Sequence, residues 1–418
     1  MLSIGIDDTD SKRGGCTTYI AALLADELSG VEEARLVRLN PNVPWKTRGN
    51  ASVCLRVDCG IEDVKRKVLQ IVEEYSFLED EGTNPGVVFF EGEVPNKFKE
   101  LYHQALHGIV SLDEAEGIAK EHGAELHKFK NGRGVIGALA AIGSDFGDST
   151  YEIIAYRQRE NWGKERRIDE ESVFEMDAST APLTFNNVDH VTKRILITPR
   201  SPCPVLFGIR GENKEVLESA FAMVRAEEPI ERTRIFLTNQ GTDAHLREVE
   251  MISEAKPYSS VILEGTVARE PKTILGGHVV SALSDGSESI DFAAYEPTKD
   301  FRKVVKALIL GDRIRVYGGI RCNSTADEPM TINLEKVEVL RLAEVYREQN
   351  PVCEVCNRRM ESAGREQGFR CRRCKTRSDK KDKVEVKRTL EEGLYSAPAS
   401  AMRHLSKPLS RYTVNMPS

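Results

Sequence analysis

Acidic side chains crowd the start of the chain, directly after a short apolar stretch. The segment "GIDDTDS" places Asp7, Asp8 and Asp10 immediately behind residues 1–6, which read as a buried strand. Loops that follow buried strands are the usual position for sites in α/β sheets. Alternating carboxylates on such a loop can hold Mg²⁺ and leave room for phosphate oxygens. The three aspartates are therefore candidate magnesium ligands and catalytic residues.

The next residues, "KRGGCTT", supply groups that suit phosphate. Two glycines let backbone N–H groups approach an anion, and the helix expected to follow adds the positive end of its dipole. The spacing is not that of a Walker A loop. A surface loop whose Asp and Thr side chains cap a helix is the structural alternative. The candidate phosphate-binding residues are Lys12, Gly14, Gly15, Cys16, Thr17 and Thr18.

A second polar turn, "LNPNVPWKTRGN", lies between two predicted strands and is a plausible second phosphate clamp. Lys46 and Arg48 in this turn are candidates for neutralising charge during phosphoryl transfer. Trp45 has two possible roles, stacking on a base or packing against the protein.

Four of the nine cysteines form two pairs with the spacing C-x2-C, fourteen residues, C-x2-C. This spacing predicts a zinc ribbon in which Cys353, Cys356, Cys371 and Cys374 close a structural Zn²⁺ site. Basic residues and one aromatic surround the pairs, a combination that suits single-stranded or loop RNA. The candidate RNA-binding residues are Arg358, Arg359, Phe369, Arg370, Arg372 and Arg373.

The composition is that of a globular protein, with 40% hydrophobic and 30% charged residues. No apolar run approaches the roughly 18 residues of a membrane helix, and no signal peptide is recognisable, so we expect a cytoplasmic location. The net charge of −7 conceals a split, because residues 351–418 carry 16 Lys and Arg against 8 Asp and Glu. A basic end favours contact with a phosphate backbone, whereas a solvated, poorly ordered tail is the other interpretation.

Hydrophobic periodicity and turn residues predict a multidomain protein of mixed α/β and α+β class. Strands and helices alternate in the first unit. Strands with two helices in the second fit a ferredoxin-like sandwich, and five strands with one helix after the third fit an OB-fold β-barrel. The predicted domains are 1–128 (α/β, ATP-binding), 129–255 (ferredoxin-like), 256–345 (OB-fold), 348–378 (zinc ribbon) and 379–418 (a basic tail, either docked or disordered).

Nine segments together resemble one known family. They are "GIDDTDS", "GGCTTY", "LNPNVPWKTRGN", "GRGVIGALAAIG", "NWG", "TFNNVD", "CPVLFGIRG", "NQGTDAHL" and the terminal cysteine pairs. In this order, over nearly the whole chain, they resemble the archaeal tRNA(Ile) 2-agmatinylcytidine synthetases. The resemblance implies an N-terminal kinase-like domain, a ferredoxin-like domain, an OB-fold and a zinc ribbon. It also implies that the threonine at position 18 accepts a phosphoryl group.

The implied activity joins agmatine to C2 of the wobble cytidine in the CAU anticodon of isoleucine tRNA, so that the anticodon reads AUA. ATP would be consumed to AMP and pyrophosphate, with Mg²⁺ and structural Zn²⁺ as cofactors and no evident protein or membrane partner. The target base must leave the anticodon stack to react. Agmatine is a dication whose guanidinium suits a carboxylate, and Glu160 and Asp189 are the candidates.

Two other functions remain open at this point. A small-molecule kinase or ligase with accessory nucleic-acid-binding domains would use the same acidic loop without needing RNA as substrate. A non-enzymatic nucleic-acid-binding protein would leave the acidic, glycine-rich start of the chain without a purpose.

Overall fold

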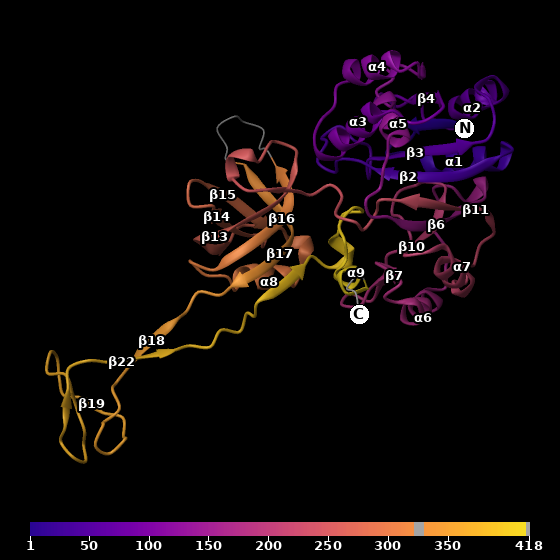
Figure 1. The fold of residues 1–418 in the computed structure, drawn as a ribbon. Coiled ribbons are helices and arrows are strands. Elements are labelled where there is room, and N and C mark those ends of the chain that lie inside the picture. Colours follow the sequence, from indigo (N-terminus) through magenta and orange to yellow (C-terminus); the bar gives the residue numbers. More distant parts are fainter. Residues whose placement is uncertain (322–329, 415–418) are drawn as a thin grey trace.

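The computed structural model describes residues 1–321 and 330–414 (Figure 1). Its largest body is a single nine-stranded sheet with the order β5-β4-β1-β3-β2-β11-β6-β10-β7. β2 (Val31–Arg38) and β11 (Ile230–Thr238) pair in parallel over two register positions and join the two halves of this sheet. The residues before and after position 128, which the sequence assigned to two domains, therefore share one continuous sheet.

Each half of this sheet has the chain order β-α-β-β-α-β. The first half contains β1 (Leu2–Asp7), α1 (Thr17–Glu27), β2, β3 (Ala51–Val57), α2 (Ile61–Tyr75) and β4 (Gly86–Glu91). The second contains β6 (Thr150–Arg157), α6 (Glu170–Thr180), β7 (Thr184–Phe185), β10 (Val205–Gly211), α7 (Lys214–Met223) and β11, with a small hairpin of β8 (Val188–Asp189) and β9 (Arg194–Ile195). In both halves the strands lie in the order fourth, first, third, second, and all these neighbours are antiparallel.

Helices cover these sheets because alternate strand residues are apolar on the covered faces. In the first half, α1 and α2 pack on one face. On the other lie α3 (Asn96–His107), α4 (Leu112–Glu121) and α5 (Val135–Ile142), and β5 (Glu125–Lys128) forms the edge. In the second half, Ile153 and Ala155 of β6 pack beneath α6 and α7, so Glu152 and Ile154 face the opposite side. None of the helices in the described ranges is long and apolar enough to cross a membrane.

A second sheet closes on itself. Its strands are β13 (Ser260–Thr273), β14 (Val279–Ser284), β15 (Ser289–Ala294), β16 (Arg313–Arg321) and β17 (Thr331–Arg341), with α8 (Phe301–Lys306) between β15 and β16. β13 pairs with both β14 and β16, while β15 runs parallel to β17, so the five strands form a ring around one apolar core. β12 (Arg247–Val249) and β23 (Gly393–Ser396) extend this sheet beside β13 and β17.

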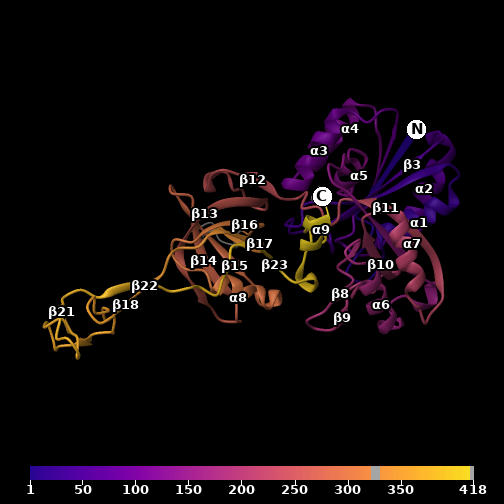
Figure 2. The same cartoon turned by 60° about the horizontal axis from the view of Figure 1, so that its bottom comes forward.

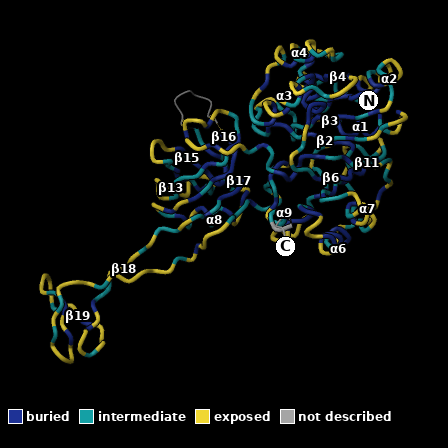
Figure 3. The backbone as a smooth tube through the Cα atoms, viewed as in Figure 1, coloured by how far each residue is buried: buried dark blue, intermediate teal, exposed yellow. Residues whose placement is uncertain are grey.

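The four-cysteine unit stands away from the rest of the protein (Figure 1). β18 (Tyr346–Gln349) and β22 (Asp382–Glu385) pair as a two-stranded stalk that carries it. The unit holds three short strands, β19 (Glu361–Ser362), β20 (Phe369–Arg370) and β21 (Arg377–Ser378). Most of its surface is exposed (Figure 3), and its small core contains Cys353, Met360, Phe369 and Cys371.

The C-terminal tail docks on the body, which is one of the two outcomes left open by its sequence. After β22 the chain returns through β23, and the last described element is the short helix α9 (Leu409–Val414), which lies between the two sheets (Figure 2). Glu335 of β17 accepts a hydrogen bond from Ser406 of the tail and forms ion pairs with His245 and Arg403. Burial alone would raise the pKa of Glu335, but His245 and Arg403 outweigh burial and hold that pKa below its ordinary value.

We expect the acid stability of the protein to depend on Glu335. Because the pKa of this carboxyl is lower in the folded chain than in the unfolded one, its contribution is complete above the ordinary pKa and is lost as the pH falls below it. A Glu335→Gln variant should therefore unfold at a lower temperature than the wild type at pH 7. At pH 3.5 the difference between their unfolding temperatures should be smaller. Thermal unfolding at both pH values measures this, with the exposed Glu248→Gln as the control. A gap of equal size at both pH values would contradict the expectation.

Candidate active site

A cavity of about 310 Å³ lies between the first half of the large sheet, the second half and the tail. The end of β1 and the starts of α1 and α5 form one side of the cavity. The face of β6 and β10 that lies opposite α6 and α7 forms another side. Eight of the predicted site residues line it, namely Asp7, Asp8, Asp10, Cys16, Thr17, Thr18, Lys46 and Arg48. The structure therefore brings the acidic loop, the start of α1 and the polar turn 39–50 to one place.

Asp7 is the aspartate that packs against α5. Its Oδ1 accepts a hydrogen bond of 2.7 Å from the backbone N–H of Asp8. A Cβ atom on Gly137 would overlap the Asp7 carboxylate, so the first turn of α5 packs directly onto this group. Burial, together with the nearby charge of Asp8, raises the pKa of Asp7 well above its ordinary value. A buried carboxylate of this kind is stabilised in its charged form by a cation.

Asp8 and Asp10 each face an arginine. Asp8, with a backbone φ of 58°, lies 2.6 Å from Nη2 of Arg133, and Asp10 lies 2.7 Å from Nη2 of Arg48. Burial outweighs Arg133 and raises the pKa of Asp8 to about 6, and burial also raises the pKa of Asp10.

The predicted ligand set of three aspartates is not formed as one cluster. Among the described residues, the four cysteines are the one group of three or more Cys, His, Asp or Glu side chains placed closely enough to share a metal ion. The reason is that Asp10 is directed towards Arg48. Asp7 and Asp8 are adjacent in the chain and remain as the pair at the end of β1.

The glycine turn has a structural role that the sequence did not predict. The ring of Phe77 packs where a side chain of Gly14 would lie, and Gly15 has a φ of 74°. Arg48 donates to the carbonyl of Gly15 at 2.6 Å, so this turn presents a carbonyl to the protein. Gly14, Gly15 and the exposed Lys12 do not line the cavity, and their role in phosphate binding stays a prediction.

The start of α1 does face the cavity. Thr18 is 7% exposed, and its hydroxyl lies 3.0 Å from the thiol of Cys16. The helix begins at Thr17 with no side chain capping it. The first N–H groups of a helix have no partner within the helix, so this end suits an anion.

The floor of the cavity carries charged residues, and of these Glu152, Arg133 and Arg210 were missed by the sequence reasoning. Glu152 accepts from Gln240 at 2.5 Å and from Arg210 at 3.3 Å. Burial lowers the pKa of Arg38 to about 10, which leaves this guanidinium charged at neutral pH. Glu152 carried a usable signal, since it is an acidic residue next to the apolar run Ile153–Ala155 of a predicted strand. Arg133 and Arg210 lie in the segments "GRGVIGALAAIG" and "CPVLFGIRG", which contributed only to the family resemblance.

The polar turn 39–50 forms the mouth of the cavity. Lys46 is half-buried, its Nζ donates to the carbonyl of Val43 at 3.2 Å, and burial lowers its pKa. Trp45 and Ile109 also line the cavity and are 49% and 44% exposed. Of the two roles open to Trp45, the structure leaves the ring accessible for stacking.

The two candidates for an agmatine carboxylate lie elsewhere. Glu160 is exposed and Asp189 is buried in β8, and neither lines the cavity. Asp189 accepts from the backbone N–H groups of Val191 and Thr192 at 3.0 and 3.1 Å, which makes it a turn-stabilising residue. Both assignments therefore stay predictions that the lining of this cavity does not support.

The four-cysteine unit has the geometry of a closed metal site. The Sγ atoms of Cys353, Cys356, Cys371 and Cys374 all lie within 4.8 Å of one another, which fits four thiolates around a tetrahedral zinc. The predicted arginines are exposed around it: Arg358, Arg359, Arg370, Arg372 and Arg373. Phe369 is 9% exposed and packs in the core of the unit, so its ring is not presented to RNA as the sequence suggested.

We expect one zinc ion per chain, held by these thiolates. A Cys371→Ser variant should lose the metal and become sensitive to proteases between residues 350 and 380, because the small core depends on the site. Metal analysis and limited proteolysis measure this, and Cys59→Ser, a half-buried cysteine outside the cluster, is the control. Full zinc content in Cys371→Ser would contradict the assignment.

Comparison with known proteins agrees with this geometry. The chain matches family profiles described as the TiaS TCKD domain over residues 3–65, the TiaS FLD domain over 132–245 and the TiaS C-terminal zinc ribbon domain over 350–390. The isoleucine-tRNA 2-agmatinylcytidine synthetase TiaS of Archaeoglobus fulgidus is 45% identical over 98% of this chain and 97% of its own length.

Solved structures of TiaS match over the whole chain. The crystal structure of TiaS in complex with its isoleucine tRNA and ATP matches with a TM-score of 0.87 and 44% identity. The complex of TiaS with the same tRNA, AMPCPP and agmatine matches with a TM-score of 0.85 and 41% identity. Each match covers 100% of this chain and 98% of the solved one. The resemblance seen in the sequence is confirmed, and this chain belongs to the family of isoleucine-tRNA 2-agmatinylcytidine synthetases.

Proposed function

We propose that this chain is an ATP-dependent carbon–nitrogen ligase that joins agmatine to C2 of the wobble cytidine in the CAU anticodon of isoleucine tRNA. Agmatine replaces the 2-carbonyl oxygen, so the anticodon reads AUA, and ATP is cleaved to AMP and pyrophosphate. One observation carries this conclusion: the chain is 45% identical, over 98% of its length, to a synthetase named for this activity. A member of the same family was solved with its isoleucine tRNA, AMPCPP and agmatine.

The chemistry explains why ATP is needed. The 2-carbonyl of cytosine is a poor electrophile, and its oxygen is a very poor leaving group. When a phosphorus-containing group is transferred from ATP to that oxygen, the oxygen becomes part of a phosphate ester. It can then leave as a phosphate, which is a good leaving group. The agmatine amine then adds at C2, the C2–O bond breaks, and the amine loses its protons. A site for this reaction must hold phosphates beside a base, and the cavity combines a helix start, arginines and carboxylates.

Asp7 and Asp8 fit a magnesium ion. Mg²⁺ in proteins is commonly bound by one or two carboxylates together with substrate phosphates, which suits this adjacent pair better than a set of three. The raised pKa values of both groups fit a site that is completed by a cation. When bound, magnesium would shield the charge of the ATP phosphates. Arg133 holds Asp8, and Arg48 holds Asp10 against the glycine turn.

Thr18 and Lys46 take the remaining catalytic roles in this proposal. Thr18 accepts a phosphoryl group, which is supported by its place at the start of α1 in the cavity lining. Lys46 neutralises charge on the phosphates at the mouth. Its Nζ has a backbone carbonyl as its partner and so keeps its charge available for a ligand.

We assign the finer domain identities on strand order. The order fourth, first, third, second in residues 129–255 is that of a ferredoxin-like sandwich, and the kinase-like first half has the same order. The ring of five strands, with a helix after the third, supports an OB-fold. The OB-fold and the exposed arginines of the zinc ribbon grip the tRNA and present the extruded base to the cavity.

The direct test combines purified full-length protein, ATP, Mg²⁺, agmatine and an unmodified isoleucine tRNA transcript with a CAU anticodon. Nucleoside mass spectrometry should show cytidine that has gained agmatine minus water, and only when ATP is present. A transcript with uridine at the wobble position is the matched control and should stay unchanged. A parallel Thr18→Ala reaction tests the phosphoryl acceptor, because full product formation would remove Thr18 from the chemistry. Cytidine that stays unmodified while ATP is consumed would reject the ligase and favour a small-molecule kinase.

A further inference from the structure

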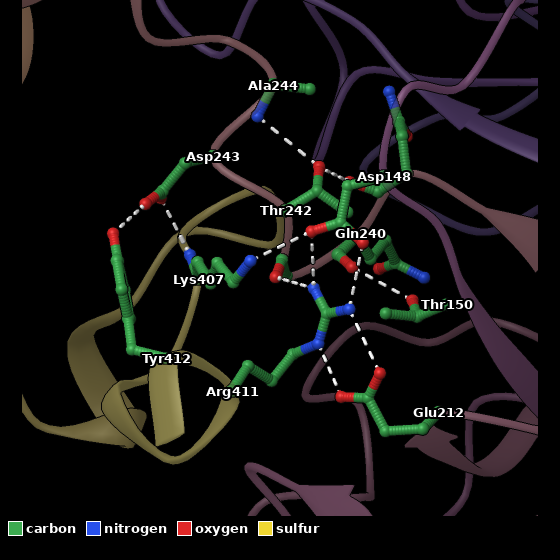
Figure 4. A network of polar contacts seen from close by, with 12 residues as sticks. Asp148, Thr150, Glu212, Gln240, Thr242, Asp243, Ala244, Lys407, Arg411 and Tyr412 are labelled. Atoms are coloured by element: carbon green, nitrogen blue, oxygen red, sulfur yellow. Dashed lines mark hydrogen bonds and ion pairs between the residues drawn. The ribbon is translucent and has the colours of Figure 1, made fainter. Parts of the chain in front are cut away.

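The tail is fixed to the large sheet by a buried arginine (Figure 4). The side chain of Arg411 is 1% exposed. Its Nη2 lies 3.0 Å from Oδ1 of Asp148, its Nε lies 2.5 Å from Oε1 of Glu212, and its Nη1 donates to the carbonyl of Gly241. Lys407 adds a bond of 3.0 Å to Asp148. These contacts hold α9 on the second half of the sheet.

The segment just before α9 is held by its backbone. The N–H groups of Gly241 and Asp243 donate to the carbonyls of His404 and Leu405, each at 2.8 Å. The Leu405 side chain is 2% exposed and belongs to the apolar core beneath α3 and α5. His404 therefore has little freedom to move relative to the large sheet.

This anchoring places the imidazole of His404 in the wall of the cavity. The residue is exposed and belongs to the lining. Its Nδ1 lies 2.9 Å from Nη2 of Arg210, which can only donate. Nδ1 is therefore the acceptor, and the neutral ring carries its proton on Nε2. The charges of Arg38 and Arg210 hold the pKa of His404 well below its ordinary value, which keeps the ring neutral.

Gly49 shows that His404 and Arg38 meet at one point. A Cβ atom there would lie 2.5 Å from Nη1 of Arg38 and 3.0 Å from Cδ2 of His404, so the glycine leaves space for both groups. The guanidinium of Arg38, the imidazole of His404 and the guanidinium of Arg210 thus stand side by side on one wall. Two cations with an N–H donor between them suit an anionic oxygen and disfavour a cation such as agmatine.

We propose that the tail completes the active site by supplying His404, whose Nε2–H donates to a phosphoryl oxygen of the reacting substrates while its Nδ1 holds Arg210 in place. This inference rests on the proposed function, which identifies the phosphate-bearing substrates. His404 is thus a binding residue contributed from a segment about 190 residues away in sequence from the arginine that it holds.

Three substitutions separate the two nitrogens of His404. His404→Ala removes both. His404→Asn keeps an acceptor near the position of Nδ1, and His404→Gln keeps a donor near that of Nε2. In single-turnover reactions with tRNA, ATP and agmatine, we expect Ala and Asn to slow product formation about 100-fold, as for loss of one oxyanion donor. Gln should retain most of the rate, and the affinity for agmatine, measured by calorimetry, should stay within about twofold in all three. His122→Asn, at the end of α4 and outside the cavity lining, is the control.

ATP cleavage is followed in the same reactions, so that the two proposals can fail separately. Equal product formation by His404→Ala and wild type would overturn the role of His404 and leave the proposed function intact. Full activity of His404→Asn with loss in His404→Gln would also overturn it, because the ring would then act only on Arg210. If wild type forms no product but its ATP cleavage still falls in His404→Ala, the proposed function fails and the contact with a phosphoryl oxygen stands.

Discussion

An Asp8→Asn variant should bind tRNA and lose the ligation reaction, with a rate at least about 1000-fold below wild type. The substitution keeps the size of the side chain and removes its charge. It removes one of the two carboxylates of the proposed magnesium pair. It also leaves Arg133, whose Nη2 lies 2.6 Å from the Asp8 carboxylate in the wild type, without its counter-ion. Product formation under single-turnover conditions, with tRNA affinity measured separately, tests both parts of this expectation.

Asp113→Asn is the matched control for this variant. Asp113 is an exposed aspartate in the first turn of α4, outside the cavity lining, and should keep wild-type activity. An Asp8→Asn enzyme that retained more than about a tenth of the wild-type rate would remove Asp8 from the metal site, because losing a metal ligand costs far more than this.

Replacing Arg411 should have the largest effect on stability. Arg411→Met keeps most of the apolar stem and leaves Asp148 and Glu212 without their shared cation in a partly buried site (Figure 4). Breaking such a pair by removing one partner costs about 3 kcal/mol. The variant should therefore unfold at a lower denaturant concentration. It should also ligate agmatine more slowly, because the tail that carries His404 is released.

Arg225→Met provides the comparison for Arg411. Arg225 also pairs with two acids, Asp169 and Glu175, but its side chain is 55% exposed. Exposed pairs contribute about 1 kcal/mol or less, so this variant should unfold close to wild type. Equal destabilisation by the two substitutions would show that burial of the Arg411 site has no special effect.

Local patterns predicted elements better than they predicted the way the elements join. β1, α1, α2 and the five strands of the second sheet have clear apolar periodicities, and all appear in the structure. α6 gives no clear helical signal, because its buried side includes Ser172, Asp177 and Thr180 and so has no continuous apolar stripe. The parallel pairing of β2 with β11 could not be predicted. The two strands lie about 200 residues apart, and nothing in the sequence shows that the edge strands of the two halves pair with each other.

The same limit applied to the active site. Asp8 and Thr18 were found because a single short segment contains both the loop and the helix start. Arg133 lies 125 residues from the aspartate that it holds, and His404 lies 194 residues from Arg210. Their contacts depend on tertiary packing, so isolated residue types gave no signal. Gly14, Gly15 and Phe369 are required for packing, and residue chemistry alone does not show this.

The stalk leaves β17 and returns to β23, and these two strands are antiparallel neighbours in register at Val339 and Gly393. Everything between them is topologically an insertion at the tip of a β-hairpin. A short turn between Val345 and Val386, whose backbones are already hydrogen-bonded at 2.8 Å, could replace the stalk and the zinc ribbon, and it would keep Leu390 in the barrel core and the ion pair between Arg388 and Asp312. The zinc ribbon is therefore a module that could be gained, exchanged or lost independently, while the tail beyond β23 must remain because its His404 lines the cavity.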